Sequence, residues 1–299
     1  TIKNGKGFIG ALSALIKRLA VDRLHVVGDI FDRGPRADSI LDMLMSHHSV
    51  DIEWGNHDIL WMGAASGSLS CIAAVVRNCL AYNNTQILEN GYGIPLRPLT
   101  LFAEKLYPDL SPVQAALEAV SIMMFKLEGQ LIRRNPSFQM EDRLLLERIS
   151  PAAAAVEADG RVWTLRPRKL PTVDWTNPYA LTPEEEAVIL DLQDAFLHSL
   201  RLRSHVDFLY SRGRLYRCYN GNLLFHGCIP LDENGDFLVK RLGSQELSGK
   251  SLMDYADAMA RKAYFTGRQE ALDFMWYLWC GTHSPLSGKY KIATFERYF

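Results

Sequence analysis

Two short apolar segments, each ending at a glycine, constrain the fold of this chain most. Residues 24–27 (LHVV) stop at Gly28, and residues 50–54 (VDIEW) stop at Gly55. Between them, residues 36–48 place apolar side chains at helical spacing. A strand, a helix and a second strand with short connections predict a parallel βαβ unit. Binding sites in such sheets form beyond the carboxyl ends of the strands, where both glycines stand.

Most of the chain between this unit and residue 205 is predicted to be helical. Helical spacing occurs over residues 69–82, 112–132 and 141–149, and also over residues 8–20, which precede the βαβ unit. A further helix is expected after Thr182, which Pro183 and three glutamates follow. Four prolines exclude a long helix over residues 151–180. Residues 206–240 are expected to form strands separated by turns, and helices return after residue 248.

We therefore predict an α/β fold in which mixed sheets, arranged as a sandwich, are flanked by helices and interrupted by a largely helical insert. Residues 1–68 would form the first part of the core, residues 69–205 the insert, and residues 206–299 the second part of the core with the helices that follow.

Composition narrows the class of protein. The 299 residues suffice for a large core, and 33 basic against 34 acidic residues leave the chain nearly neutral. We therefore expect neither nucleic acid nor a membrane surface as a partner. No signal peptide and no apolar run of about 18 residues is found. The five cysteines, an odd number without a C-x-x-C pair, indicate reduced thiols and a cytoplasmic location.

The first polar motif is Gly28-Asp29-Ile30-Phe31-Asp32-Arg33-Gly34. The two oxygens of Asp29, at a strand end, could bridge two cations. Asp32 could orient a neighbouring imidazole, and the planar guanidinium of Arg33 suits a phosphate. A turn with a capping aspartate and a solvated arginine is the simpler reading of this motif taken alone.

The second motif, Gly55-Asn56-His57-Asp58, favours a metal and phosphate site over a simple capped turn. An asparagine carbonyl oxygen is a neutral metal ligand, and an adjacent histidine can protonate a leaving alkoxide. Two such motifs, each directly after a strand, resemble the metal sites of calcineurin-like phosphoesterases. A third motif, residues 223–230, places His226 before a glycine at a strand end. His226 taken alone would be read as a core histidine; beside the other motifs it resembles the histidine metal ligand of that superfamily.

Longer strings resemble one family, the class III fructose-1,6-bisphosphatases of bacteria, over nearly the whole chain. They include LAVDRLHVVGDIFDRGP, HSVDIEWGNHDILWMGAASGS, YNGNLLFHGCIPL and MWYLWCG. The family pattern also has an Asp-x-His pair upstream and a Gly-His downstream, and neither occurs here. Because these would supply most ligands of a first metal, we expect this chain by itself to retain mainly the second, through Asp29, Asn56 and His226.

The resemblance implies hydrolysis of a sugar bisphosphate, fructose 1,6-bisphosphate, to fructose 6-phosphate and phosphate in gluconeogenesis. Two divalent ions, expected to be Mn²⁺, would activate the attacking water. Asp29 would bridge them, Arg33 would stabilise the phosphoryl oxygens, and His57, oriented by Asp32, would protonate the leaving oxygen. The contacts of the second phosphate stay open; the short basic clusters at Arg133–Arg134 and residues 166–169 are candidates, although solvated surface is the simpler reading.

Two alternatives remain open from the sequence. The first keeps the chemistry and changes the substrate, as in a protein or dinucleotide phosphatase of the same superfamily. The second is an inactive, metal-poor fragment or regulatory binding module. A homo-oligomer is also open.

Overall fold

The computed structural model describes residues 2–165 and 170–287 of the chain. It is an α/β structure in which helices predominate, and this confirms the predicted class. A small parallel sheet is formed by β1 (Leu24–Val26), β2 (Val50–Glu53) and β6 (Gly213–Arg214), in the order β1-β2-β6. Helix α2 (Ala37–Met45) connects β1 to β2, so the predicted βαβ unit is confirmed.

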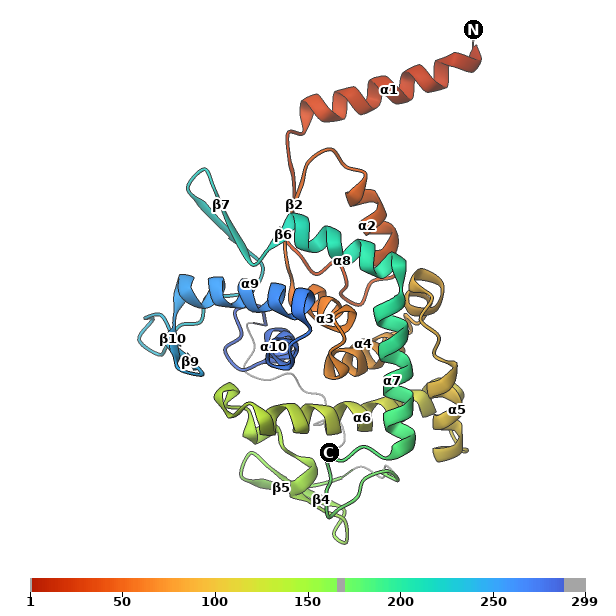
Figure 1. Ribbon diagram of the computed structural model, residues 1–299, viewed down its shortest axis with the longest axis vertical. Coiled ribbons are helices and arrows are strands. Elements are labelled where there is room, and N and C mark those ends of the chain that lie inside the picture. Colours follow the sequence, from red (N-terminus) through yellow and green to blue (C-terminus); the bar gives the residue numbers. More distant parts are fainter. Residues whose placement is uncertain (1, 166–169, 288–299) are drawn as a thin grey trace.

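A layer of helices packs beside this sheet and builds the core (Figure 1). Helix α3 starts directly after β2 and contacts α4 and α10. Below them α6 crosses under α4, and α7 runs along α4 and α5. The bounds of these helices are α3 Asn56–Ala65, α4 Leu69–Ala81, α5 Arg97–Leu106, α6 Pro112–Arg134, α7 Pro183–His198, α9 Gly249–Thr266 and α10 Gln269–Cys280.

The start predicted for α7 is confirmed in detail. The Thr182 hydroxyl accepts a hydrogen bond from the Glu185 amide, and the Glu185 carboxylate accepts one from the Thr182 amide. The same carboxylate pairs at 2.7 Å with the buried Lys126 of α6. Glu185 thus helps to cap the N-terminus of α7 and also links α7 to α6 through an ion pair.

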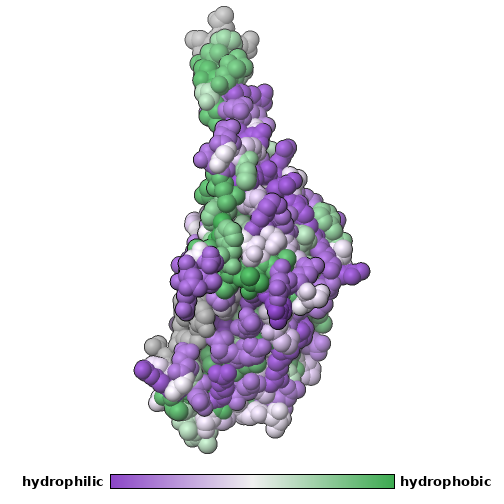
Figure 2. Space-filling view, turned by 90° about the vertical axis from the view of Figure 1, so that its left-hand side faces the viewer, coloured by the Kyte–Doolittle hydropathy of each residue, from purple (hydrophilic) through white to green (hydrophobic). Residues whose placement is uncertain are grey.

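Helix α1 (Ile2–Ala20) projects from the body of the molecule (Figures 1 and 2). Every residue from Lys6 to Ala20 is exposed, including an apolar stripe along one face. This stripe consists of Phe8, Ile9, Leu12, Leu15, Ile16 and Leu19. The helix predicted over residues 8–20 is therefore present, but its apolar face does not contribute to the core among the described residues.

Residues 206–210 were expected to form a strand, and that prediction is wrong. They lie in helix α8 (Leu200–Arg212), which buries Leu202, Val206 and Leu209 on one face. The spacing of these residues is helical. The prediction failed because a short apolar run such as VDFLY suits a strand as well as a buried helix segment. The helix ends before Gly213, which packs directly against the Trp54 side chain. A larger residue would not fit there, because a Cβ on Gly213 would lie 1.9 Å from the indole nitrogen.

Two other expectations need correction. Residues 141–149 form two single 3-10 turns, Glu141–Arg143 and Leu146–Arg148, and enter strand β3, instead of forming an α-helix. Of residues 236–240, Lys240 alone lies in a strand. The remaining strands pair in small antiparallel sheets: β3 Ile149–Ser150, β4 Ala155–Ala158 and β5 Arg161–Thr164; β7 Tyr216–Tyr219 and β8 Asn222–Phe225; β9 Lys240–Leu242 and β10 Gln245–Leu247. The division at residues 68 and 205 stays a prediction.

Candidate metal and catalytic site

The turns after β1 and β2 lie in direct contact because each has a glycine where they approach most closely. A Cβ on Gly55 would lie 2.1 Å from the Asp29 carboxylate, and one on Gly28 would lie 2.5 Å from the carbonyl oxygen of Glu53. Gly28 also has a φ of 86°, and Asp29 has a φ of 54°, in the left-handed region. The close approach of two backbones therefore brings Asp29 to the start of α3.

Asp58 holds the two turns together. Its side chain is completely buried and accepts hydrogen bonds from the amides of Asp29 (2.8 Å), Phe31 (3.2 Å) and Gly55 (2.9 Å). Burial raises the pKa of this carboxyl to about 6. Asp58 was given no role from the sequence, although an acidic residue three positions after a helix cap can accept a hydrogen bond from the cap's backbone amide, as Asp58 does from Gly55.

His226, directly after β8, faces Asp29. Its Nδ1 lies 2.6 Å from the Val27 carbonyl oxygen, and its Nε2 lies 3.3 Å from Oδ2 of Asp29. The bond to Asp29 raises the pKa of His226 to about 9. Burial acts to raise the pKa of Asp29, but the bond to His226 helps to hold it below its usual value. The Val27 carbonyl thus fixes the ring and directs the second nitrogen at the carboxylate, as in a metal-binding histidine.

Asn56 is the first residue of α3, between Gly55 and His57. Its Nδ2 donates a hydrogen bond to the carbonyl oxygen of Trp279 at 3.2 Å. The amide is thereby oriented, and among the described residues no donor is bonded to its carbonyl oxygen. Asp29, Asn56 and His226 therefore offer a carboxylate, an amide oxygen and an imidazole, and such a set of mainly oxygen ligands with one nitrogen fits a divalent ion such as Mn²⁺.

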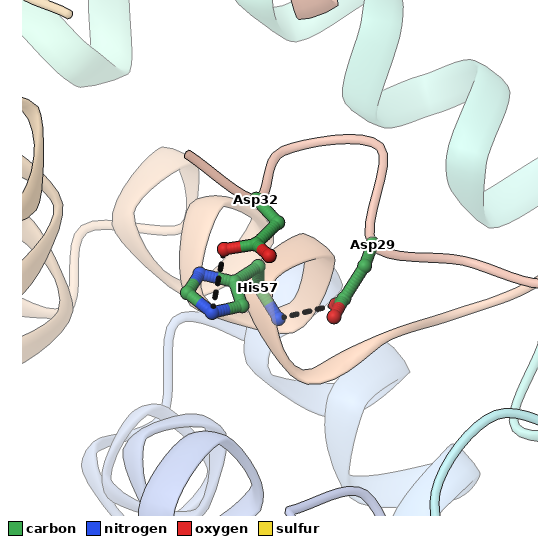
Figure 3. A group of neighbouring side chains, drawn as sticks. All are labelled: Asp29, Asp32 and His57. Atoms are coloured by element: carbon green, nitrogen blue, oxygen red, sulfur yellow. Dashed lines mark hydrogen bonds and ion pairs between the residues drawn. The ribbon is translucent and has the colours of Figure 1, made fainter. Parts of the chain in front are cut away.

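Asp32 and His57 lie next to each other and beside Asp29 (Figure 3). Nε2 of His57 lies 3.1 Å from Oδ1 of Asp32, and the His57 amide donates to Oδ1 of Asp29 at 3.1 Å. Ligand-capable atoms of Asp29, Asp32 and His57 all lie within 4.8 Å of one another, so this group could also hold a cation. Arg33 lies beside them, with its Nε 3.3 Å from Asp32 and its guanidinium over the Tyr82 ring.

The other five residues singled out from the sequence are thus brought around Asp29. This arrangement leaves their roles as predictions. The basic pair at Arg133 and Arg134 is engaged elsewhere: Arg133 pairs with Glu147, and Arg134 makes two hydrogen bonds to the buried Asp273. These two arginines are therefore poor candidates for the second phosphate. The cluster at residues 166–169 lies outside the described residues.

Fold and site together define an α/β protein with a candidate divalent-metal centre beyond the carboxyl ends of parallel strands. Comparison with known proteins gives the family. The chain matches the Firmicute fructose-1,6-bisphosphatase family over residues 1–299 and belongs to it.

Relatives named fructose-1,6-bisphosphatase class 3 support this assignment. The one from Clostridium tetani is 50% identical over 312 residues, covering 96% of this chain and 47% of the relative. Those from Clostridium novyi and Clostridium acetobutylicum are each 46% identical, covering 98% and 100% of this chain and 48% and 49% of the relatives. The chain therefore spans about half the length of these relatives. No solved structure matches it.

Proposed function

We propose that this chain carries the central part of the active site of a metal-dependent fructose-1,6-bisphosphatase, which releases fructose 6-phosphate and phosphate. One observation carries the proposal: the Asp29 carboxylate contacts the oriented ring of His226 through Oδ2 and accepts a hydrogen bond through Oδ1 from the amide of His57, whose ring pairs with Asp32. The family assignment and the names of the relatives support the substrate. The cytoplasmic location of the protein and any homo-oligomeric state are predictions from the sequence.

We assign the residues three roles, namely metal binding, phosphate binding and proton donation. Asp29, Asn56 and His226 would hold a divalent cation. When bound, the cation would polarise the phosphate as a Lewis acid and activate a water molecule. Arg33, exposed beside the site, would bind the phosphoryl oxygens with its planar donors. The His57 imidazolium would give its proton to the leaving sugar oxygen, while Asp32 holds the ring in place.

No span of at least 18 residues in the described helices is apolar enough to cross a bilayer.

The experiment that tests the proposal is phosphate release by the full-length protein with Mn²⁺ or with a chelator. Fructose 1,6-bisphosphate would be compared with a phosphoserine peptide and a dinucleotide. We expect Mn²⁺-dependent release with strong preference for the sugar bisphosphate. Preference for either other substrate would keep the phosphoesterase and reject the proposed substrate, and absence of metal binding would reject both.

A further inference from the structure

A small cavity lies beside the candidate acid, between α3 and the end of α4. Arg33 and His57 form part of its wall, as does Phe31 of the same loop. Asp29, Asn56 and His226 are not among the described residues that line it. The cavity therefore adjoins the proton-donating side of the site, away from the proposed metal ligands.

The lining combines aromatic faces with carboxamides. Phe31 and Trp61 are buried and stacked at 4.6 Å, and they form part of the floor. Tyr82, 40% exposed, stands at the surface with the Arg33 guanidinium 4.8 Å above its ring. Asn78 and Asn84 complete the polar part of the lining. Aromatic rings cover the C–H faces of a sugar, and carboxamides can both donate to and accept from its hydroxyls.

The two asparagines have unused hydrogen-bonding capacity. Nδ2 of Asn84 donates to the Gly34 carbonyl oxygen at 3.0 Å, which leaves its own carbonyl oxygen without a donor among the described residues. Oδ1 of Asn78 accepts from Arg77 at 3.3 Å, and its amide nitrogen has no acceptor among the same residues. A ligand hydroxyl group could bond to either side chain without displacing an existing hydrogen bond.

The chemistry places the leaving group here. In the proposed hydrolysis the bond between phosphorus and the sugar oxygen breaks, a water oxygen adds to phosphorus, and His57 gives a proton to the departing oxygen. With the phosphoryl group held between Asp29 and Arg33, that oxygen faces His57. The rest of the sugar must then extend past His57, toward the cavity.

We propose that Asn78, Tyr82 and Asn84 form the subsite for the sugar leaving group; this inference rests on the proposed function. The free space inside the cavity is about 20 Å³, room for about one water molecule. The sugar ring therefore binds across the mouth, against Tyr82, and its hydroxyls reach the carboxamides. This subsite determines which phosphate ester is accepted, whereas the metal side binds any phosphate.

The two products separate the two halves of the site, so product inhibition tests the subsite directly. The variants are Asn78→Ala and Tyr82→Ala in the full-length, Mn²⁺-loaded protein. Asn84 is avoided because it also tethers the Gly34 loop. Each variant should raise the KM for fructose 1,6-bisphosphate and the Ki of fructose 6-phosphate about 2- to 10-fold, as expected for one lost contact. The Mn²⁺ content should not change in either variant, and the Ki of inorganic phosphate should not change in Asn78→Ala; Tyr82→Ala also removes the ring beneath the Arg33 guanidinium, so Asn78→Ala is the variant that separates the two products.

Two controls make the result specific. Tyr82→Phe keeps the ring and should lose less affinity than Tyr82→Ala, and the exposed Asn90→Ala should behave as wild type. In Asn78→Ala, an equal loss of affinity for both products would mean a general disturbance of the site and would overturn the subsite, as would no change for either product. Failure of the wild-type protein to hydrolyse fructose 1,6-bisphosphate would instead overturn the proposed function before any variant is compared.

Discussion

Nε2 of His226 lies 3.3 Å from Oδ2 of Asp29, although almost two hundred residues separate them in the sequence. The segment directly after β1 supplies both halves of this arrangement: the Val27 carbonyl oxygen fixes the imidazole, and Asp29 follows two residues later. A histidine and a carboxylate that face each other in this way can exchange their mutual contact for a shared cation.

His226→Ala should therefore weaken Mn²⁺ binding. Loss of one of three ligands is expected to lower the affinity at least about 10- to 100-fold, the range seen even for residues behind the ligands. Titration calorimetry of the full-length protein measures this directly. His198→Ala is the matched control, since His198 is an exposed histidine on α7. Equal Mn²⁺ affinity in both variants would remove His226 from the ligand set.

His57→Ala should lower turnover about 10²- to 10⁴-fold because it removes the proton donor for the leaving oxygen. Asp32→Asn should act in the same direction but less strongly, since the ring stays and only its orienting charge is lost. Metal content by atomic spectroscopy separates the two possible roles of this pair. Unchanged metal with low turnover supports the acid, whereas metal loss in both variants would make Asp32 and His57 ligands.

Asp58→Asn should destabilise the protein and loosen the site together. The carboxylate accepts three backbone amides, and an asparagine would turn a donor toward them. We expect the free energy of unfolding to fall by about 1.5–3 kcal/mol, the value of a hydrogen bond to a charged group. Urea unfolding measures the change, and Asp254→Asn, at an exposed ion pair on α9, serves as control. A variant as stable as wild type would contradict the clamping role.

Glu53 predicts a dependence of stability on pH. Its side chain is fully buried, and among the described residues neither oxygen has a well-formed hydrogen bond. His25 of β1, Arg217 of β7 and Asp51 of its own strand are the ionisable groups beside it. Burial, the largest cause, raises the pKa of Glu53 from 4.5 to about 7.

Because the folded state holds this proton more tightly than the unfolded chain, Glu53 makes the protein less stable as pH rises from about 4.5 to 7. Glu53→Gln cannot ionise, so it should match wild type near pH 4.5 and exceed it by roughly 1–3 kcal/mol at pH 8. Urea unfolding at both pH values tests this, with the exposed Glu246→Gln as control. A difference that does not vary with pH would contradict it.

The sequence determined the parts of the protein whose signals are local. The βαβ unit, the capping of α7 by Thr182 and Glu185, and the identity of the polar residues after each strand follow from spacing and residue type. Local signals failed over residues 206–210, where an apolar run suits either a strand or a buried helix. Burial against Trp54 and the turn at Gly213 decided for the helix.

Tertiary structure alone decided how the site is assembled. No spacing in the sequence shows that the Val27 carbonyl oxygen orients His226, that the Trp279 carbonyl oxygen orients Asn56, or that Asp58 joins the two glycine turns. The same holds for the cavity next to His57, which α4 completes. The physical reason is that backbone carbonyls and amides are identical in every residue, so their roles exist only once distant segments pack against one another.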